Sequence, residues 1–586
     1  MGDSGSPSLP NGGTPKELAQ QFSNFFTQKI DTIRHDLQSI ASPISQLPET
    51  HADVSEPLVA FAPASQEEVR AIIKKSPDKS CELDPVPTWL LKQCLDELLP
   101  LVTNIINTSM EASYVPRDFK CARIRPLLKK PGLDPDTLKH YRPVSNLPFI
   151  SKVLEKVVDA RLERHLVTNS LHECSQSAYR KFHSTESALL KVQNDILQSL
   201  DQGCLSVLVL LDLSAAFDTI DHRTLLHRLE HCFGISGKPL SWMTSYLTDR
   251  YQTVCVDGEL SEPVLMECSV PQGSVLGPKN YVMYTKPLGD VIRTHGLCYH
   301  FYADDTQLYL SFKSKDDVAQ SEALTRIESC LKDIESWMHH NMLKLNTDKT
   351  EVMLFSSRHN SKSTDTISVN VGNSLIASRS HVRNLGVMFD STMTMEQQVN
   401  AVCRSCYGQL RKIGHIRRYL SSEATKTLVN GLVTSRLDYC NALLHGLPNN
   451  LIDKLQRVQN TAARITTRTS RRSHITPVLK ELHWLPIRYR IQYKILVHTF
   501  NALNDRSPLY IKDMLAVYRP SRTLRSLNSL TLVTPRIRTV TYGKRCFNHA
   551  APSLWNALPN NIREAGTIST FKKMLKTHFF LVHFGN

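Results

Sequence analysis

Apolar residues recur every three or four positions over several long stretches of the chain, which is the spacing of one face of an α-helix. The first stretch runs from residue 15 to about residue 40 and includes three phenylalanines. Ser151 and Glu155 stand where a capping box would open another helix. The remaining helical stretches cover 69–75, 89–110 (two helices), 153–166 and 396–472.

Shorter runs of apolar and β-branched residues predict strands at 122–128 and 205–211. The second run is almost continuously apolar and too short to cross a membrane, so it predicts a buried central strand. Within 300–310, two β-prone runs flank Asp304 and Asp305. This pattern predicts a β-hairpin that carries both acids in its turn.

Carboxylates stand at the ends of these predicted strands. Asp212 directly follows the buried strand, and a carboxylate at such an edge is costly without a partner. An Asp pair in a turn is common by itself. If neighbouring strands bring Asp212 beside Asp304 and Asp305, however, the three charges require cations. Two Mg²⁺ ions about 4 Å apart would neutralise them and support phosphoryl transfer.

The overall composition indicates a globular protein, and the charge is unevenly distributed. The 586 residues are 41% hydrophobic, and no run of about 18 apolar residues predicts a membrane-spanning helix. The net charge is +15. Residues 401–586 contain 30 Lys and Arg but only 7 Asp and Glu, with aromatic residues interleaved. This pattern favours contact with a nucleic-acid backbone and stacking on bases.

Seven segments follow the order of the reverse transcriptase motifs, and Phe301-Tyr302-Ala303-Asp304-Asp305 resembles motif C. Leu211 to Asp218 resembles motif A. The segments that resemble two fingers motifs, then motifs B, D and E, are 127–131, 141–145, 269–278, 343–351 and 384–387. The chain is identified, from about Glu67 onward, as a member of the non-LTR (LINE-type) retrotransposon reverse transcriptases, in the broad jockey and chicken-repeat grouping.

This resemblance implies an α+β right-hand polymerase with fingers, an antiparallel-sheet palm and a helical thumb, followed by a basic C-terminal extension. The predicted domains are a disordered tail, helix and linker (1–60), a helical N-terminal extension (61–111), reverse transcriptase fingers and palm (112–390), a helical thumb (391–474) and a basic C-terminal region (475–586).

The resemblance also implies RNA-directed DNA polymerase activity. Asp212, Asp304 and Asp305 would be catalytic and would hold two Mg²⁺ ions, for which Mn²⁺ could substitute. The incoming triphosphate would be gripped by Arg142 and by Lys129 or Lys130. The remaining nucleotide contacts would be Phe217, as a steric gate against a ribose 2′-OH, together with Gln272 and Gly273.

Further roles follow from the same resemblance. Either Lys344 or Lys349 would be the general acid that protonates the leaving pyrophosphate. The expected contacts with template, primer and duplex are Arg180, Lys181, Leu385, Gly386, Arg411, Lys412, Arg417 and Arg418. The partners would be an RNA template (the element's own RNA), a DNA primer or target, and dNTPs. An endonuclease would be encoded upstream, and the protein would act inside the cell, in cytoplasm and nucleus.

Two alternatives remain open from the sequence. Lys279 and Asn280 occupy helix positions that are usually apolar in this family, which favours a decayed or co-opted relic that only binds nucleic acid. A different right-hand polymerase, such as a group II intron maturase or an RNA-copying RNA polymerase, is the other alternative. Phe217 argues against ribonucleotide use, and the wording of motifs B and C argues against a maturase.

Overall fold

The computed structural model describes residues 9–40, 54–78, 81–358, 366–519 and 530–585. The predicted disordered residues 1–8 and most of the predicted linker, 41–53, lie outside the described residues, as do the arginines within 520–529. The chain divides into two compact units. The first contains residues 1–176, 212–296 and 330–346, and the second contains 177–211, 297–329 and 347–586.

The first unit combines helices with a five-stranded sheet. Its helices are α1 (Pro15–Ile40), α2 (Gln66–Lys75), α3 (Thr88–Gln93), α4 (Leu95–Glu111), α5 (Arg117–Lys120), α6 (Phe149–Thr168), α8 (His222–His231), α9 (Gly237–Leu247), α10 (Leu276–Thr285) and α11 (Leu288–Thr294). Its strands are β1 (Ala122–Leu128), β2 (Tyr141–Asn146), β4 (Leu213–Ser214), β5 (Tyr251–Val256), β6 (Glu259–Leu260), β7 (Val264–Leu265) and β10 (Lys344–Leu345).

The second unit contains a four-stranded antiparallel sheet in the order β11-β3-β9-β8 and a large helical part. Its strands are β3 (Cys204–Leu211), β8 (Cys298–Tyr302), β9 (Asp305–Lys313), β11 (Glu351–Phe355), β12 (Ser368–Val371), β13 (Ser374–Ala377), β14 (His381–Asn384) and β15 (Val387–Asp390). Its helices are α7 (Thr185–Asp201), α13 (Glu396–Ile416), α14 (Ser422–Val429), α15 (Ser435–Asp438), α16 (Asn449–Thr467), α17 (Ile475–Glu481), α18 (Ile487–Leu503), α19 (Leu509–Lys512), α20 (Phe547–Asn556), α21 (Asn560–Arg563) and α22 (Ile568–Phe584). Helix α12 (Asp317–His340) has residues in both units.

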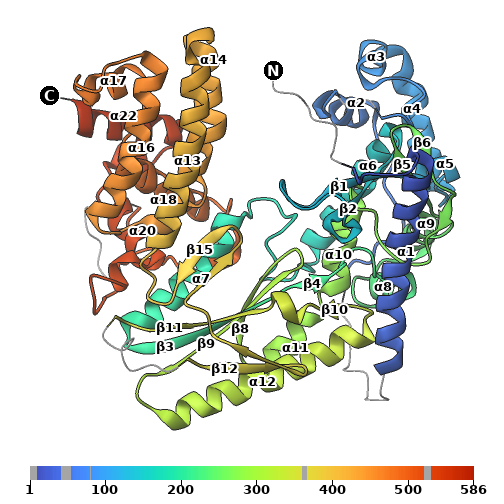
Figure 1. Cartoon of the computed structure of the whole chain (residues 1–586), viewed down its shortest axis with the longest axis horizontal. Helices are drawn as coiled ribbons and strands as arrows, with labels where there is room; N and C mark the ends of the chain where they lie inside the picture. The colour runs from blue at the N-terminus through green and yellow to red at the C-terminus, as the bar shows by residue number, and fades with distance from the viewer. Residues whose placement is uncertain (1–8, 41–53, 79–80, 359–365, 520–529, 586) are drawn as a thin grey trace. The chain divides into compact units, whose positions relative to one another are not determined.

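Helix α1 has the bounds predicted from its periodicity, but it is not an isolated element between tail and linker. Its apolar face, which includes Leu18, Phe22 and Phe26, is buried against the sheet of the first unit. Figure 1 shows this helix lying along β5 and β6. The aromatic ring of Phe22 meets Tyr141 of β2 edge-on, with ring centroids 4.9 Å apart. The prediction that treated residues 1–60 only as a tail, helix and linker missed this packing.

The described C-terminal residues, 475–519 and 530–585, contribute to the core of the second unit. Three points of contact hold α7, which itself packs under β3. Glu186 at its start pairs with Lys494 of α18 at 3.3 Å. Asn194 accepts the backbone N–H of Asn548 at 3.1 Å, and Asp201 at its end accepts the N–H of Thr539 at 2.6 Å. The region is therefore joined to the helix beneath the central strand rather than simply appended to the chain.

The capping box predicted for helix α6 is not formed. Helix α6 begins at Phe149 after Pro148, so Ser151 and Glu155 do not form its capping box. Instead Glu155 is buried and accepts the backbone N–H groups of Val275 and Leu276, at 2.6 and 2.9 Å. These donors open α10, so the carboxylate caps a different helix, the one that follows motif B.

Lys279 is buried in α10, but its charge is compensated. Its ammonium group lies 2.7 Å from Asp159 and 2.8 Å from Glu163 of α6. This pairing offsets the desolvation that made Lys279 look like a lesion. Asn280 is fully buried as well, and within the described part of the chain its side-chain amide makes no hydrogen bond. Its burial therefore remains costly.

The ion pairs of Lys279 should contribute less to the free energy of unfolding at acidic pH. The hydrogen bond from His172, and then the pairing with Lys279, lower the pKa of Glu163 from 4.5 to about 2, against an opposing effect of burial. A depressed carboxyl pKa stabilises the fold above its unfolded value of 4.5, and this contribution is lost as the pH falls toward 2. We expect Lys279→Met to lower the free energy of unfolding at pH 7. On acidification, the variant should lose less of this free energy than wild type does.

Urea unfolding of wild type and Lys279→Met at pH 7 and pH 4 measures this effect. The difference in the free energy of unfolding between the two proteins should be smaller at pH 4 than at pH 7, because Glu163 contributes less to stability at pH 4. Lys238→Met is a suitable control, since Lys238 forms an exposed pair with Glu111. A gap that stays constant with pH would show that Lys279 stabilises α10 only through packing.

Candidate active site

The hairpin that carries the adjacent acids is present, and its turn is tighter than predicted. Strands β8 and β9 pair down to Tyr302 opposite Asp305, so the turn consists of Ala303 and Asp304. Ala303 has a φ of 57°, the left-handed conformation that two-residue hairpin turns require. Asp305 is the first residue of β9 rather than a turn residue. Asp304 is half-buried and Asp305 is exposed.

The strand register relates the hairpin to the end of β3. Strands β3 and β9 are antiparallel, with Leu211 opposite Thr306. Asp212 follows Leu211 in the chain, and Asp305 precedes Thr306. Asp212 itself is half-buried; its carbonyl oxygen accepts the N–H of Asn346 at 2.9 Å, and its carboxylate accepts the side-chain amide of Asn346 at 3.3 Å. Asn346 therefore holds the backbone and the side chain of the predicted metal ligand.

A buried hydrogen-bond network supports strand β8 at His300, four residues before Asp304. The hydroxyl of Ser177 lies 2.8 Å from Nε2 of His300 and 2.7 Å from the hydroxyl of Tyr510. The ring of Tyr510 meets His300 edge-on at 4.8 Å. Burial lowers the pKa of His300 to about 3, so the imidazole is neutral at physiological pH. Sequence reasoning missed Tyr510, because no local motif marks it.

The segment expected to lie against the template begins beside the acidic hairpin. Burial, and secondarily the charge of Asp304, raise the pKa of Tyr179. This aromatic side chain is exposed, and its φ of 59° indicates a constrained turn. Of the two predicted template contacts in this segment, Arg180 is half-buried and Lys181 is exposed, with its ammonium 4.8 Å from the ring centroid of Phe182.

The predicted primer-grip residues form the turn of the hairpin β14–β15. Leu385 and Gly386 both have positive φ, 42° and 85°, as a two-residue turn of this type requires. The amide of Asn384, just before the turn, donates to the side-chain carbonyl oxygen of Gln307 at 2.7 Å in a buried site. Since Gln307 lies two residues after Asp305 on β9, the β14–β15 hairpin is tied to the acidic hairpin within the second unit.

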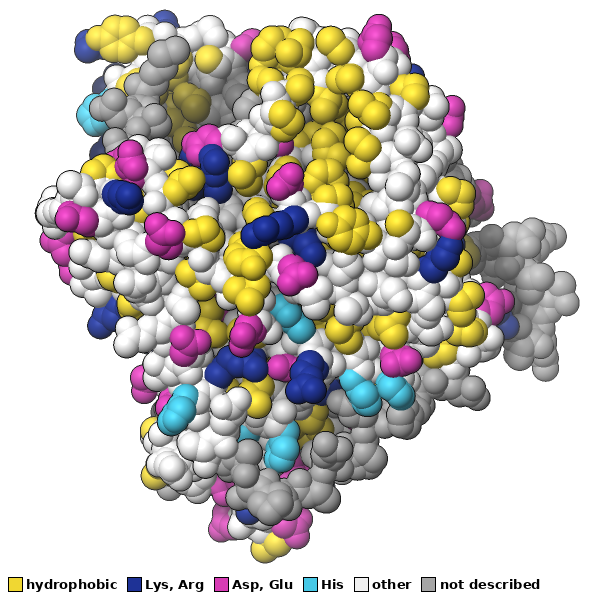
Figure 2. Space-filling model, turned by 90° about the vertical axis from the view of Figure 1, so that its right-hand side faces the viewer, with side chains coloured by type: hydrophobic (Ala, Val, Ile, Leu, Met, Phe, Trp, Pro, Cys, Tyr) yellow, Lys and Arg dark blue, Asp and Glu magenta, His cyan; other side chains and the backbone are white. Residues whose placement is uncertain are grey.

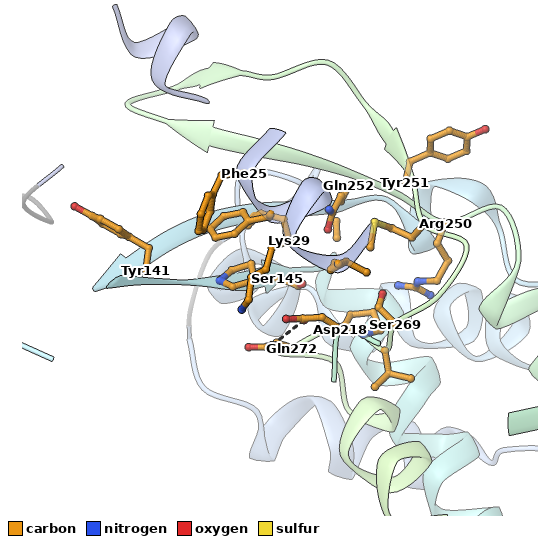
Figure 3. Close-up of a pocket in the computed structure, with 18 of the residues that line it drawn as sticks. Phe25, Lys29, Tyr141, Ser145, Asp218, Arg250, Tyr251, Gln252, Ser269 and Gln272 are labelled. Atoms are coloured by element: carbon orange, nitrogen blue, oxygen red, sulfur yellow. Dashed lines mark hydrogen bonds between the residues drawn. The ribbon is translucent and has the colours of Figure 1, made fainter. Parts of the chain in front are cut away.

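Motif B forms one wall of a cavity of about 280 Å³ in the first unit. Figure 3 shows Gln272 and Asp218 joined at this cavity, and the amide of Gln272 donates to Asp218 at 2.9 Å. The backbone carbonyl of Gln272 accepts the N–H of Ser145 on β2 at 2.8 Å. Gly273 has a φ of 128°, and a Cβ atom there would overlap the Ser145 carbonyl oxygen. A glycine at this position therefore permits the close approach of the motif B backbone to β2.

We expect Gly273→Ala to impair nucleotide use more than any ordinary glycine substitution. The added methyl group forces the motif B loop away from β2 and strains a φ that alanine rarely adopts. The KM for dNTP in primer extension should rise by about tenfold or more, as for the loss of one well-placed contact. Gly408→Ala is the matched control, because nothing lies within 4 Å of a Cβ at that helical site. Equal behaviour of the two variants would contradict the role of the loop.

The other predicted nucleotide contacts lie in the first unit as well. The ring of Phe217 stacks on that of Tyr281 with centroids 4.9 Å apart, which fixes the orientation of the predicted steric gate. Arg142 is exposed on β2, opposite Leu127. Lys129 lines the cavity and donates to the carbonyl oxygen of Lys139 at 2.6 Å. Lys130 is exposed and is not among the residues that line the cavity, which favours Lys129 as the phosphate contact.

The two general-acid candidates differ in their surroundings. Lys344 of β10 pairs with Asp36 of α1 at 2.8 Å, so its ammonium group is engaged with the N-terminal helix. Lys349 is exposed at the end of a short 3₁₀ turn, Thr347–Lys349. The assignment of a general acid stays a prediction.

The basic residues predicted to track a duplex are divided by their contacts. Arg411, Lys412 and Arg418 are exposed, and the guanidinium of Arg418 lies over the ring of exposed Tyr419, 4.7 Å from its centroid. Arg417 donates to the carbonyl oxygens of Leu420, Ile465 and Thr466. These bonds give Arg417 a structural role, and its contact with nucleic acid stays a prediction. On the face shown in Figure 2, by contrast, Lys and Arg side chains are interspersed with Asp and Glu.

The acidic residues fit a magnesium site by their chemistry. Carboxylate oxygens are the hard ligands that Mg²⁺ prefers, and a few carboxylates are usually completed by water and substrate phosphates. Among the described residues, no three His, Cys, Asp or Glu side chains form a closed metal-binding group. A site completed by the nucleotide phosphates is compatible with that observation. None of the described helices is long and apolar enough to cross a membrane.

Comparison with known proteins agrees with this arrangement. Residues 128–389 match the family described as reverse transcriptase (RNA-dependent DNA polymerase). The chain is 27% identical to the "Probable RNA-directed DNA polymerase from transposon BS" of Drosophila melanogaster over 72% of its own length and 46% of that protein. It is also 27% identical to the RNA-directed DNA polymerase from mobile element jockey of the same species, over 67% of this chain and 42% of the relative.

A more distant relative is the Pol polyprotein from type-1 retrotransposable element R1 of Bradysia coprophila, 25% identical over 67% of this chain and 37% of the relative. The chain thus spans less than half the length of these relatives. The four-stranded sheet with its acidic hairpin lies within the residues that match the reverse transcriptase (RNA-dependent DNA polymerase) family, and the chain is similar to RNA-directed DNA polymerases of non-LTR elements such as jockey.

Proposed function

We propose that this chain is an RNA-directed DNA polymerase that extends a primer 3′-OH with dNTPs on an RNA template. The observation that carries the proposal is the register of β3 and β9. Leu211 of β3 pairs with Thr306 of β9. Asp212 follows Leu211 in the chain and Asp305 precedes Thr306, so each acid adjoins a member of the same residue pair. Asp304 adjoins them in the hairpin turn. This register supports the proposal that the three carboxylates would share one edge of the palm sheet.

Asp212, Asp304 and Asp305 would hold two divalent ions, with Mg²⁺ favoured by the all-carboxylate ligands. When bound, such ions lower the cost of ionising the primer 3′-OH and neutralise charge on the leaving pyrophosphate. The chain supplies the remaining functions. Lys129 and Arg142 bind triphosphate oxygens, for which a mobile ammonium and a planar guanidinium are suited.

Sugar selection and substrate placement follow from the neighbouring side chains. The Phe217 ring, held by stacking on Tyr281, presents an apolar wall to the position of a 2′-substituent. A ribose hydroxyl placed there would be desolvated without a partner, so dNTPs are preferred over rNTPs. Gln272 contributes a polar contact at the cavity wall, and the Leu385–Gly386 turn holds the primer end.

The nucleic-acid contacts define the other parts of the polymerase. The sheet that contains β1, β2 and β5 corresponds to the fingers, and helices α13 to α16 correspond to the thumb. Exposed cations such as Arg411, Lys412 and Arg418 would follow phosphates, which gives sequence-tolerant and salt-dependent binding. The element's own RNA is the expected template, and a nick supplied by a separate endonuclease activity is the expected source of the primer.

Primer extension tests the proposal directly. Purified protein is incubated with an RNA template, an annealed DNA primer, dNTPs and Mg²⁺, and the products are resolved by length. We expect extension that stops on chelation of the metal, weakens with rising salt, and is much poorer with rNTPs. Absence of extension by folded protein that binds the template–primer duplex would overturn the enzymatic proposal.

A further inference from the structure

The cavity beside motif B has a wall that no reverse transcriptase motif supplies. Four residues of α1 line it, among them Phe25 and Lys29, opposite Gln272 and Asp218. Figure 3 shows the Lys29 side chain extending from α1 toward Asp218. The position of α1 is fixed by its buried apolar face and by two ion pairs, Arg34 with Asp221 at 3.2 Å and Lys344 with Asp36 at 2.8 Å.

Asp218 determines which way the Gln272 amide faces. An ionised carboxylate only accepts hydrogen bonds, so Gln272 must present its NH₂ group to it, as the 2.9 Å contact shows. The carbonyl oxygen of Gln272 is consequently turned away from Asp218. A protonated or neutral group at position 218 could also donate, which would allow the opposite orientation. The charge on Asp218 is therefore what makes the orientation of Gln272 unique.

Lys29 favours that charge. The pKa of Asp218 is raised above its usual value by burial, and Lys29 and then the hydrogen bond from Gln272 reduce this shift without reversing it. Cys268 donates to the backbone carbonyl of Asp218 at 3.5 Å and lies on the segment that leads into motif B. The other charged or titratable groups that line the cavity are Lys120, Lys129, Lys139, Tyr141, Arg250 and Tyr251. Of these cations, Lys120, Lys129 and Arg250 are hydrogen-bonded to backbone carbonyls.

We propose that Lys29 and Asp218 are positioning residues that fix Gln272 with its carbonyl oxygen available to a hydrogen-bond donor on the incoming nucleotide. Helix α1 is then a working part of the nucleotide-binding site rather than an element outside the polymerase. The inference rests on the proposed polymerase function. It adds a dependence of nucleotide affinity on one exposed lysine that precedes every reverse transcriptase motif in the chain.

The test measures nucleotide affinity in a complex that cannot extend its primer. The protein is bound to an RNA template annealed to a primer that lacks a 3′-OH, and the Kd for the next complementary dNTP is determined. We expect Lys29→Met to raise this Kd about three- to fivefold, the range for a partly exposed charge pair, and Lys29→Arg to restore it. Asp218→Asn should raise it about tenfold, because the new amide can donate as well as accept. Lys16→Met, at an exposed site on the same helix, should have no effect.

The pH dependence separates positioning from simple structural support. As pH falls, protonation of Asp218 releases Gln272 and the Kd rises. Without Lys29 this rise should begin at a higher pH, and in Asp218→Asn it should disappear. A wild-type Kd and pH profile for Lys29→Met would overturn the inference, as would a loss of folded protein that Lys29→Arg does not restore. A wild type that neither binds dNTP in this complex nor extends a normal primer would instead refute the proposed function itself.

Discussion

Replacing Asp304 by Asn is expected to lower the rate of primer extension by about 10³-fold or more, with the protein still folded. The change keeps the size of the side chain but removes a charge and a metal-ligand oxygen from the turn of the β8–β9 hairpin. Because the hairpin closes through the pairing of Tyr302 with Asp305, the backbone does not depend on the replaced carboxylate. The measurement is single-nucleotide extension at saturating dNTP, with thermal unfolding as the check of folding.

Two comparisons sharpen this prediction. Asp212→Asn should cause a similar loss, and the double variant should be little worse than either single one, since residues that hold the same ions act as a unit. Asp257→Asn is the matched control: Asp257 is an exposed turn residue between β5 and β6. Full activity of Asp304→Asn, or independent and additive losses in the double variant, would contradict a shared metal site.

Removing residues 475–586 is expected to prevent folding of the second unit rather than to yield a trimmed polymerase with weaker nucleic-acid binding. The segment contributes buried Phe500, Trp555 and Phe571 to one apolar cluster. Loss of a single buried aromatic side chain of this size typically costs about 3–5 kcal/mol, a large part of the stability of a domain. The truncation also removes Lys494 from Glu186, Asn548 from Asn194 and Thr539 from Asp201 along α7.

Solubility and cooperative thermal unfolding of the chain ending at His474 measure this effect, and co-expression of 475–586 as a separate polypeptide should restore both. Tyr510→Phe is the smaller companion variant. It keeps the ring against His300 but removes the hydroxyl bonded to Ser177, so we expect folded protein with reduced extension. A soluble, cooperatively unfolding and active 1–474 chain would show that the C-terminal region is dispensable for the palm.

The sequence was most informative where function and local structure coincide. The apolar run at 205–211 and the paired runs at 300–310 correspond to β3, β8 and β9, because strand periodicity and turn chemistry are local properties. The glycine at position 273 was also predictable, since close backbone approach leaves glycine as the residue without overlap. A metal-binding role for Asp212, Asp304 and Asp305 could be predicted because the motifs that contain them follow the family's order along the chain.

Contacts between distant segments could not be read in this way. Lys29 with Asp218, Asn384 with Gln307 and Ser177 with Tyr510 are pairs with no sequence spacing that marks them. Glu155 is an example of a local pattern that predicts the wrong contact. Its position predicts a capping box for its own helix, whereas tertiary packing makes it the cap of α10. The pairing of Lys279 is likewise invisible until α6 and α10 are packed together.

The bond between Ser177 and Tyr510 joins residues 333 positions apart, and this has a consequence for synthesis. At translation rates of 5–20 residues per second, Tyr510 emerges roughly 15–70 s after Ser177. Until then the strand that bears the acidic hairpin lacks its support, and the nascent chain presents unfinished apolar surface to chaperones. A messenger with a stop codon before Tyr510 would therefore yield a polypeptide that contains Asp212, Asp304 and Asp305 but lacks the residue that supports strand β8 through Ser177.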